Sequence, residues 1–126
     1  MIITKHIFCS FSTDNIEAAI VFYEEKLGLN THKNEMGVLE VEISAHQYVM
    51  IYPKPNHVPA TFTVLNFMVD DIYSAVNQLR KRQICFERYD HPIKTDKDGV
   101  FDNKEGHKIA WFKDNAQNIL SVIQHD

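Results

Sequence analysis

The chain has 126 residues, the size of one compact domain or of two small halves that share a core. Hydrophobic residues make up 44% and charged residues 24%, which is typical of a globular protein and excludes general disorder. The formal net charge of −4, without any long basic run, argues against a nucleic-acid partner.

The amino-terminal residues show neither a targeting signal nor a membrane signal. MIITKHIFCSF lacks a basic start, a long apolar run and a cleavage site of small residues. No stretch approaches the roughly 20 apolar residues that span a bilayer. Cys9 and Cys85 each fall in a strand-like apolar run, so we expect two reduced core cysteines and no disulfide. These features predict a cytoplasmic protein that does not bind a membrane.

An internal repeat at an offset of 56 residues organises the chain. FSTDNIEAAIVFYEEKLGL begins at Phe11, and FMVDDIYSAVNQLRKRQIC begins at Phe67. Both segments read as a strand followed by a helix, because their apolar residues alternate first and then recur at steps of three and four. We therefore expect one domain, 1–126, made of modules 1–56 and 57–126 that share a core, with the proline-rich stretch 53–60 as linker.

The first helix is expected to begin near Asn15. Asp14 and Glu17 have the spacing of a capping box, and Gly28 is a residue that ends helices. Two strands are expected to follow, at 38–43 and 47–52.

The second helix repeats the apolar stripe of the first, and Asp70 and Asp71 are best explained as residues of its amino terminus. Strands are expected at 84–88, 108–113 and 118–124. The polar stretch 89–107 is too long for a simple hairpin connection. It is either a loop that covers a pocket or an exposed excursion.

The order of these elements, with FYEEKLGL at 22–29 and VDDI at 69–72, resembles the vicinal oxygen chelate superfamily. That group includes glyoxalase I, bleomycin-resistance proteins, fosfomycin-resistance enzymes and extradiol dioxygenases. WFKDNAQNILSV, from Trp111, is similar to the family's closing FxDPxGNxLxL segment, with Asn115 and Gln117 in place of Pro and Gly. The resemblance implies an α+β fold of two tandem βαβββ modules, a mixed sheet curved around a cleft, and a homodimer.

In metal-dependent members of that superfamily, four His, Glu or Gln ligands point into the cleft from the first and last strands of each module. The matching places in this chain are Phe8, Met50 or Ile51, Val64 and Ser121. These side chains do not form a ligand set for a hard divalent ion. The comparison with the family therefore predicts no metal and no cofactor.

An alternative metal site would be shifted toward His6. This residue shares a strand face with Phe8, two positions away, so it could offer an imidazole close to the usual place. His107 opens a later strand and could approach it. None of the seven histidines has an HxH, HxxxH or HExxH spacing, which favours structural, exposed or ligand-contacting roles.

Strand alternation identifies the side chains that we expect to face the cleft. They combine aromatic and aliphatic groups with a few hydrogen-bonding groups. The candidate ligand-binding residues are His6, Phe8, Ser10, Tyr48, Met50, Val64, Asn66, Trp111 and Ser121. Such a lining suits a small apolar or aromatic ligand. His6 and Ser10 cannot act as a base and nucleophile, because four residues on a strand span about 13 Å.

The favoured hypothesis is a metal-free protein that binds a small molecule, as the bleomycin-resistance proteins do. One alternative is an enzyme of lyase or dioxygenase type, which would use the His6 site or the polar groups of the cleft. The other is an interaction domain whose cleft is filled. The spacing of polar residues in the sequence specifies no catalytic residue.

Overall fold

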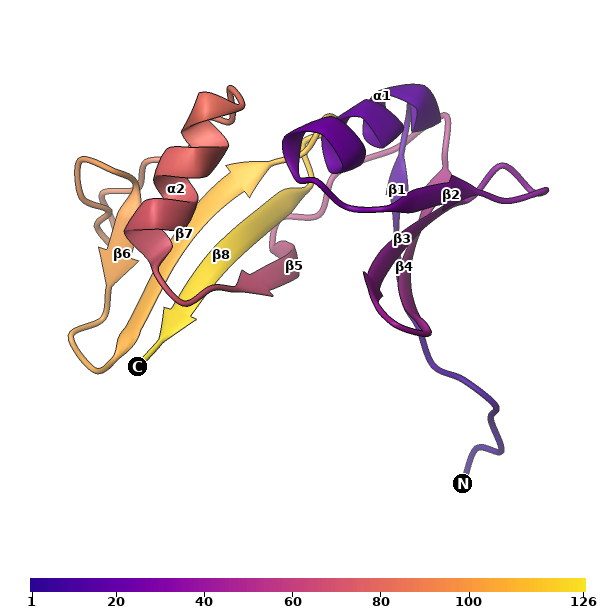
Figure 1. Ribbon diagram of the computed structural model, residues 1–126, viewed down its shortest axis with the longest axis horizontal. Coiled ribbons are helices and arrows are strands. Elements are labelled where there is room, and N and C mark those ends of the chain that lie inside the picture. Colours follow the sequence, from indigo (N-terminus) through magenta and orange to yellow (C-terminus); the bar gives the residue numbers. More distant parts are fainter. The chain divides into compact units, whose positions relative to one another are not determined.

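The computed structural model describes residues 1–126 as two compact units, Met1–Val58 and Pro59–Asp126. Each unit contains a four-stranded sheet and a helical segment (Figure 1). The strand order is β1-β4-β3-β2 in unit 1 and β5-β8-β7-β6 in unit 2. In both sheets the first and last strands of the unit are parallel neighbours, and the remaining pairs are antiparallel. The predicted α+β fold of two βαβββ modules is thereby confirmed.

Unit 1 follows the predicted order, with one additional strand. Its elements are β1 (Cys9–Thr13), α1 (Ile16–Val21), the π-helical turn η1 (Phe22–Lys26), β2 (Thr31–Lys33), β3 (Leu39–Ser44) and β4 (Gln47–Pro53). The sequence THK of β2 has no apolar alternation, which explains why this strand was not predicted. Apolar side chains from the helical segment and the central strands form the core. The fully buried ones are Ala19, Tyr23, Leu39, Val41 and Ile51.

The first helix begins one residue later than a capping box would require. The side chain of Asn15 accepts a hydrogen bond from the backbone N–H of Ala18 at 3.0 Å, so Asn15 is the N-cap. The predicted box of Asp14 and Glu17 is therefore wrong, although the predicted start near Asn15 is right. Gly28 ends the helical segment with a φ of 72°, a conformation that glycine adopts without steric cost.

Unit 2 differs from the prediction in the second of its four strands. Its elements are β5 (Thr63–Met68), α2 (Ile72–Lys81), β6 (Val100–Asp102), β7 (His107–Lys113) and β8 (Ile119–His125). The stretch 84–88, predicted as a strand, makes only an isolated bridge between Phe86 and Phe112. The edge of β7 is occupied instead by β6, which lies within the polar stretch 89–107. No helix of the chain is long and apolar enough to cross a bilayer, and α2 spans only 10 residues.

The second helix is capped at the position equivalent to Asn15 in the repeat. Asp71 lies 56 residues after Asn15, and its carboxylate accepts hydrogen bonds from Tyr73 N at 3.1 Å and Ser74 N at 3.2 Å. A carboxylate at this place also interacts favourably with the helix dipole. The prediction that Asp71 belongs to the helix amino terminus is confirmed.

Both cysteines are exposed, so their predicted place in the core is wrong. Cys85 lies between Ile84 and Phe86, which are both buried, and an extended chain turns every second side chain outward. Cys9 is the first residue of β1, which is an edge strand of its sheet.

Candidate functional site

The amino-terminal part of the predicted site is not on a strand. β1 begins at Cys9, so His6 and Phe8 precede it. Phe8 is 54% exposed, and its ring stacks on the imidazole of His6 with 6.2 Å between the ring centroids. The prediction that both residues share a strand face is wrong. No group of three or more His, Cys, Asp or Glu side chains that could hold a metal ion exists in the chain, and His107, the predicted partner of His6, lies against His125.

Three predicted site residues of unit 1 lie on one face of its sheet. Ser10 on β1 is the register partner of Met50 on β4, which in turn pairs with Glu40 on β3. Tyr48 lies two positions from Met50 on the same face, while Ile51 is fully buried on the opposite face. Glu40 was not predicted, although the alternation LEVEIS in β3 places it on this face.

In unit 2, the hydrogen bond from Ile72 N to Gln124 Oε1, 2.9 Å long, identifies the sheet face that α2 covers. Leu120 and Val122 are buried on this face. Alternation turns Ser121 and the other odd-numbered residues of β8 to the opposite side. We call this side the helix-free face of unit 2.

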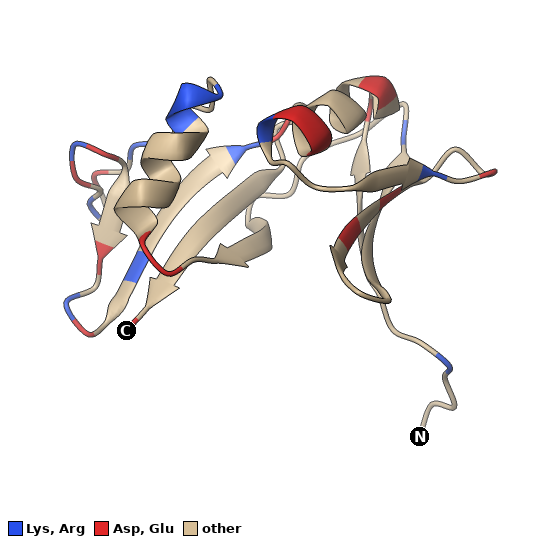
Figure 2. Ribbon diagram, viewed as in Figure 1, with Lys and Arg blue, Asp and Glu red and all other residues tan.

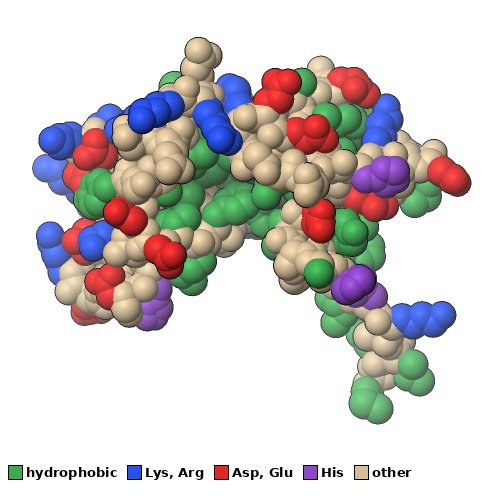
Figure 3. All heavy atoms as spheres, in the orientation of Figure 1, with side chains coloured by type: hydrophobic (Ala, Val, Ile, Leu, Met, Phe, Trp, Pro, Cys, Tyr) green, Lys and Arg blue, Asp and Glu red, His purple; other side chains and the backbone are tan.

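Two rows of side chains cross the helix-free face. Strand register aligns the first row as Asn66, Ser121 and Trp111. It aligns the second row, which is entirely apolar, as Met68, Ile123, Ile109 and Phe101. Met68 is 71% exposed, and Figure 3 shows that hydrophobic side chains reach the surface of this unit. The face therefore offers apolar area next to hydrogen-bonding groups.

The indole of Trp111 is held across the central strand β8. Its Nε1–H donates to Thr63 Oγ1 at 3.2 Å, although Trp111 is on β7 and Thr63 is on β5. Since β8 lies between these strands, the ring has to pass over it. Neighbouring strands are about 5 Å apart, so the side chain extends over roughly two strand spacings. Ser121, the register partner of Trp111, is fully buried. Tyr89 adds an edge-to-face contact with 5.4 Å between ring centroids.

Ser121 and Asn66 form the polar part of this site. The hydroxyl of Ser121, which is fully buried, donates to Asn66 Oδ1 at 2.5 Å, so the pair offers a ligand the side-chain N–H groups of the exposed Asn66. Val64 lies where the register between β5 and β8 shifts, so it does not pair with Ser121. The sequence predicted that Asn66 and Ser121 face the cleft, but it showed neither that their strands are neighbours nor that their side chains form a hydrogen bond.

The metal centre of metal-dependent superfamily members does not fit this chain. The hydroxyl of Ser121 is already committed to Asn66, and Val64 has no donor atom. Met50 offers a soft thioether between Ser10 and Glu40. No catalytic step through such an ion follows from these residues.

A second polar pair lies in unit 1. Ser12 Oγ is 2.6 Å from His57 Nδ1, a distance typical of a nucleophile and its base. Ser12 is buried, and His57 belongs to the predicted linker. The sequence did not reveal the pair, because 45 positions separate the two residues.

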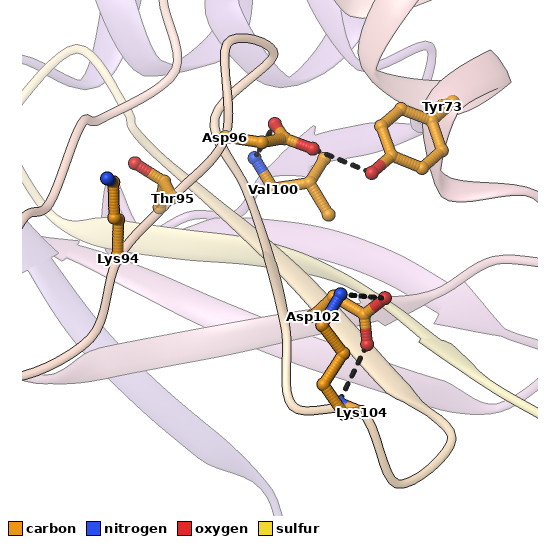
Figure 4. Close-up of a pocket in the computed structure, with 7 residues that line it drawn as sticks. All are labelled: Tyr73, Lys94, Thr95, Asp96, Val100, Asp102 and Lys104. Carbon is orange, nitrogen blue, oxygen red and sulfur yellow. Dashed lines mark hydrogen bonds and ion pairs between the residues drawn. The ribbon is translucent and has the colours of Figure 1, made fainter.

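A hollow of about 280 Å³ opens beside the start of α2 (Figure 4). Tyr73 Oη donates to Asp96 Oδ2 across it at 2.7 Å. This bond, with burial and the nearby carboxylates, raises the pKa of Tyr73 to about 12. Burial opposes ionisation of Asp96, but hydrogen bonds from Tyr73, Val100 and Asp98 outweigh it, and the net pKa of Asp96 is lowered. The other lining residues are Lys94, Thr95, Val100, Asp102 and Lys104.

The raised pKa of Tyr73 predicts a loss of stability in alkaline solution. The folded protein holds the phenolic proton more tightly than the unfolded chain, so this contribution is complete below the unfolded pKa of about 10 and disappears as the pH rises through about 12. We expect the free energy of unfolding to fall more steeply over this range in the wild type than in Tyr73→Phe. Denaturant titrations at stepped pH measure both slopes, and equal slopes would contradict the assignment.

The whole chain is similar in fold to several solved structures. The antibiotic-binding protein TnmS3 from Streptomyces sp. CB03234 is 20% identical, with a TM-score of 0.68 over 100% of this chain and 99% of the other. A putative glyoxalase family protein from Bacillus anthracis is 18% identical, with a TM-score of 0.69 over 100% of both chains. The fosfomycin resistance protein FosX from Listeria monocytogenes is 9% identical, with a TM-score of 0.69 over 99% and 96%.

No family model and no curated protein sequence matches the chain. The solved structures nevertheless show its fold, because a glyoxalase family protein and a fosfomycin resistance protein match it over nearly their full length. The chain has the fold of the vicinal oxygen chelate superfamily, as the sequence resemblance predicted.

Proposed function

We propose that this protein binds a small apolar or aromatic molecule on the helix-free face of unit 2, without a metal cofactor and without transforming it. The observation that carries the proposal is the indole of Trp111, which Thr63 holds across β8 beside the Asn66–Ser121 pair. A rigid aromatic surface with a hydrogen-bonding side chain next to it is a common arrangement in small-molecule sites.

The chemistry of the face favours an uncharged ligand. β8 carries no Lys, Arg, Asp or Glu and is tan along its length in Figure 2. Lys113, the charged residue of β7 on this face, forms an ion pair with Glu87 at 3.3 Å. The apolar row through Ile109 and Ile123 lies beside the indole and would cover a flat hydrocarbon body. The side-chain N–H groups of Asn66, whose carbonyl oxygen is held by the buried Ser121, would donate to a carbonyl or hydroxyl group of the ligand. The proposed ligand class is therefore a neutral aromatic compound with a hydrogen-bonding substituent.

The structural neighbours support a role in small-molecule binding. One is described as an antibiotic binding protein and another as a fosfomycin resistance protein. The proposal includes a cytoplasmic location and a homodimer, the second of which the superfamily resemblance implies. Sedimentation equilibrium tests the dimer, which should have twice the chain mass of 14.7 kDa.

A fluorescence and thermal-shift screen tests the proposed function. Trp111 is the only tryptophan, so its emission reports directly on the helix-free face. Neutral planar aromatic compounds should quench or shift this emission and raise the unfolding midpoint. At 100 times the dissociation constant the stabilisation should be about 2.7 kcal/mol. The ligand should be recovered unchanged by mass spectrometry, whereas the absence of any hit among such compounds would contradict the proposal.

The Ser12–His57 pair supports an enzymatic alternative. A serine hydroxyl 2.6 Å from an imidazole nitrogen could be activated for attack on an ester. This alternative predicts turnover of activated esters that Ser12→Ala abolishes. Equal background rates for the wild type and Ser12→Ala would eliminate it, while ligand binding at Trp111 would be unaffected.

A further inference from the structure

Two imidazoles meet at the end of the β7–β8 ladder. His107 begins β7, His125 ends β8, and the two residues are register partners. Their ring centroids are 4.3 Å apart, with 44° between the ring planes. Figure 3 shows histidine side chains at the surface near the carboxyl end of the chain. Pairing across strands thus joins two potential metal ligands that lie 18 positions apart in the sequence.

The backbone around this pair brings the two side chains close. Asp126 N donates to Gly106 O at 2.8 Å, and this hydrogen-bonded pair is directly next to His107 and His125. Since hydrogen-bonded and non-hydrogen-bonded pairs alternate in an antiparallel ladder, the two histidines form a non-hydrogen-bonded pair, whose side chains approach most closely. Asn103 also fixes the backbone of His107 through hydrogen bonds at 3.0 and 3.1 Å.

The surroundings of His125 favour a tautomer that can bind a metal ion. Its Nδ1 is 3.2 Å from the backbone carbonyl oxygen of Asp126. If Nδ1 carries the proton and donates to this carbonyl, Nε2 keeps a free lone pair. Histidine ligands in metalloproteins commonly have this support, with one ring nitrogen on a carbonyl and the other on the ion.

We propose that His107 and His125 form a two-imidazole binding site for a borderline divalent cation such as Ni²⁺ or Zn²⁺. Imidazole nitrogen suits these ions, whereas Mg²⁺ and Ca²⁺ prefer oxygen ligands. No third His, Cys, Asp or Glu completes the group, so water or an exogenous donor fills the remaining coordination positions. His125 is four residues beyond Ser121, about 13 Å along the strand, so this site is separate from the superfamily's metal place.

Equilibrium dialysis of untagged full-length protein with Ni²⁺ and with Zn²⁺ tests the site. The wild type should bind one ion per chain, and His125→Ala should bind at least about tenfold more weakly, because even the loss of a group that only orients a ligand costs about 10- to 100-fold. His107→Phe, which keeps an aromatic ring in the half-buried position, should show the same loss. Mg²⁺ and Ca²⁺ should not bind.

His32→Ala is the matched control, because His32 is an exposed histidine on a strand of unit 1. It should leave the affinity for Ni²⁺ unchanged. Circular dichroism of each variant verifies that it is folded. Equal affinity of the wild type and His125→Ala, or no saturable Ni²⁺ or Zn²⁺ binding to the wild type, would overturn the proposal.

Discussion

Asp114→Ala should lower the free energy of unfolding by about 3 kcal/mol and the unfolding midpoint by about 10 °C. Asp114 is only 4% exposed. Its carboxylate accepts hydrogen bonds from Ala116 N at 2.8 Å, Asn118 N at 3.0 Å and Asn118 Nδ2 at 3.0 Å. Alanine would leave these buried donors unsatisfied, which costs more than the lost bonds themselves. Thermal and denaturant unfolding followed by circular dichroism measure the effect.

The effect should be large because this turn lacks the residues that usually shape it. Asn115 stands where the similar family segment has Pro, and Gln117 stands where it has Gly. Gln117 adopts a φ of 68°, which costs a residue other than glycine about 1 kcal/mol or more. The hydrogen bonds of Asp114 stabilise this conformation between β7 and β8.

Asp14→Ala is the control for Asp114→Ala, because it removes the same carboxylate group from an exposed position. It should change the free energy of unfolding by less than about 0.5 kcal/mol. A loss below 1 kcal/mol for Asp114→Ala would show that the turn is held by its backbone hydrogen bonds alone, an outcome that contradicts the role assigned to the carboxylate.

Trp111→Ala should weaken the binding of any compound found in the screen by about 30-fold, or about 2 kcal/mol. The substitution removes the aromatic surface and also the hydrogen bond to Thr63. Trp111→Phe keeps a ring but loses the Nε1–H donor, so its affinity should lie between those of the wild type and Trp111→Ala. Isothermal titration calorimetry measures all three affinities directly, without the tryptophan emission that these variants lack.

Tyr52→Ala is the matched control for this prediction. Tyr52 is a 39% exposed aromatic residue on β4 of unit 1, so it tests whether loss of any surface ring reduces binding. Its affinity should equal that of the wild type. If Trp111→Ala bound the compound as tightly as the wild type, the ligand would lie elsewhere in the chain.

The parts of the fold that the sequence predicted depend on short-range signals repeated at a fixed offset. Asn15 and Asp71 occupy equivalent positions and both cap a helix. The apolar stripes and the glycine stop also act within a few residues, so pattern analysis could identify them. The superfamily resemblance then supplied the βαβββ order of elements in each module.

The contacts that the sequence did not predict join residues far apart in the chain. The pairs Ser12–His57, Thr63–Trp111 and His107–His125 depend on strand register and loop path, which no spacing motif encodes. The short strand β6 was missed for another reason: its sequence VFD is embedded in a polar stretch, and its pairing with β7 decides its conformation. Of the predicted site residues, strand register brings Asn66, Ser121 and Trp111 into one row, an arrangement that spacing along the sequence does not encode.

The two exposed thiols allow the chain to be labelled at two positions for a distance measurement. Cys9 belongs to unit 1 and Cys85 to unit 2, and no other cysteine is present. A pair of maleimide-linked spin labels or fluorophores therefore reports the distance between the units without any substitution. A compound from the screen, or Ni²⁺, is titrated into the doubly labelled wild type, and the distance between the two labels is measured at each step. The titration shows whether ligand binding on unit 2 changes the distance between the units.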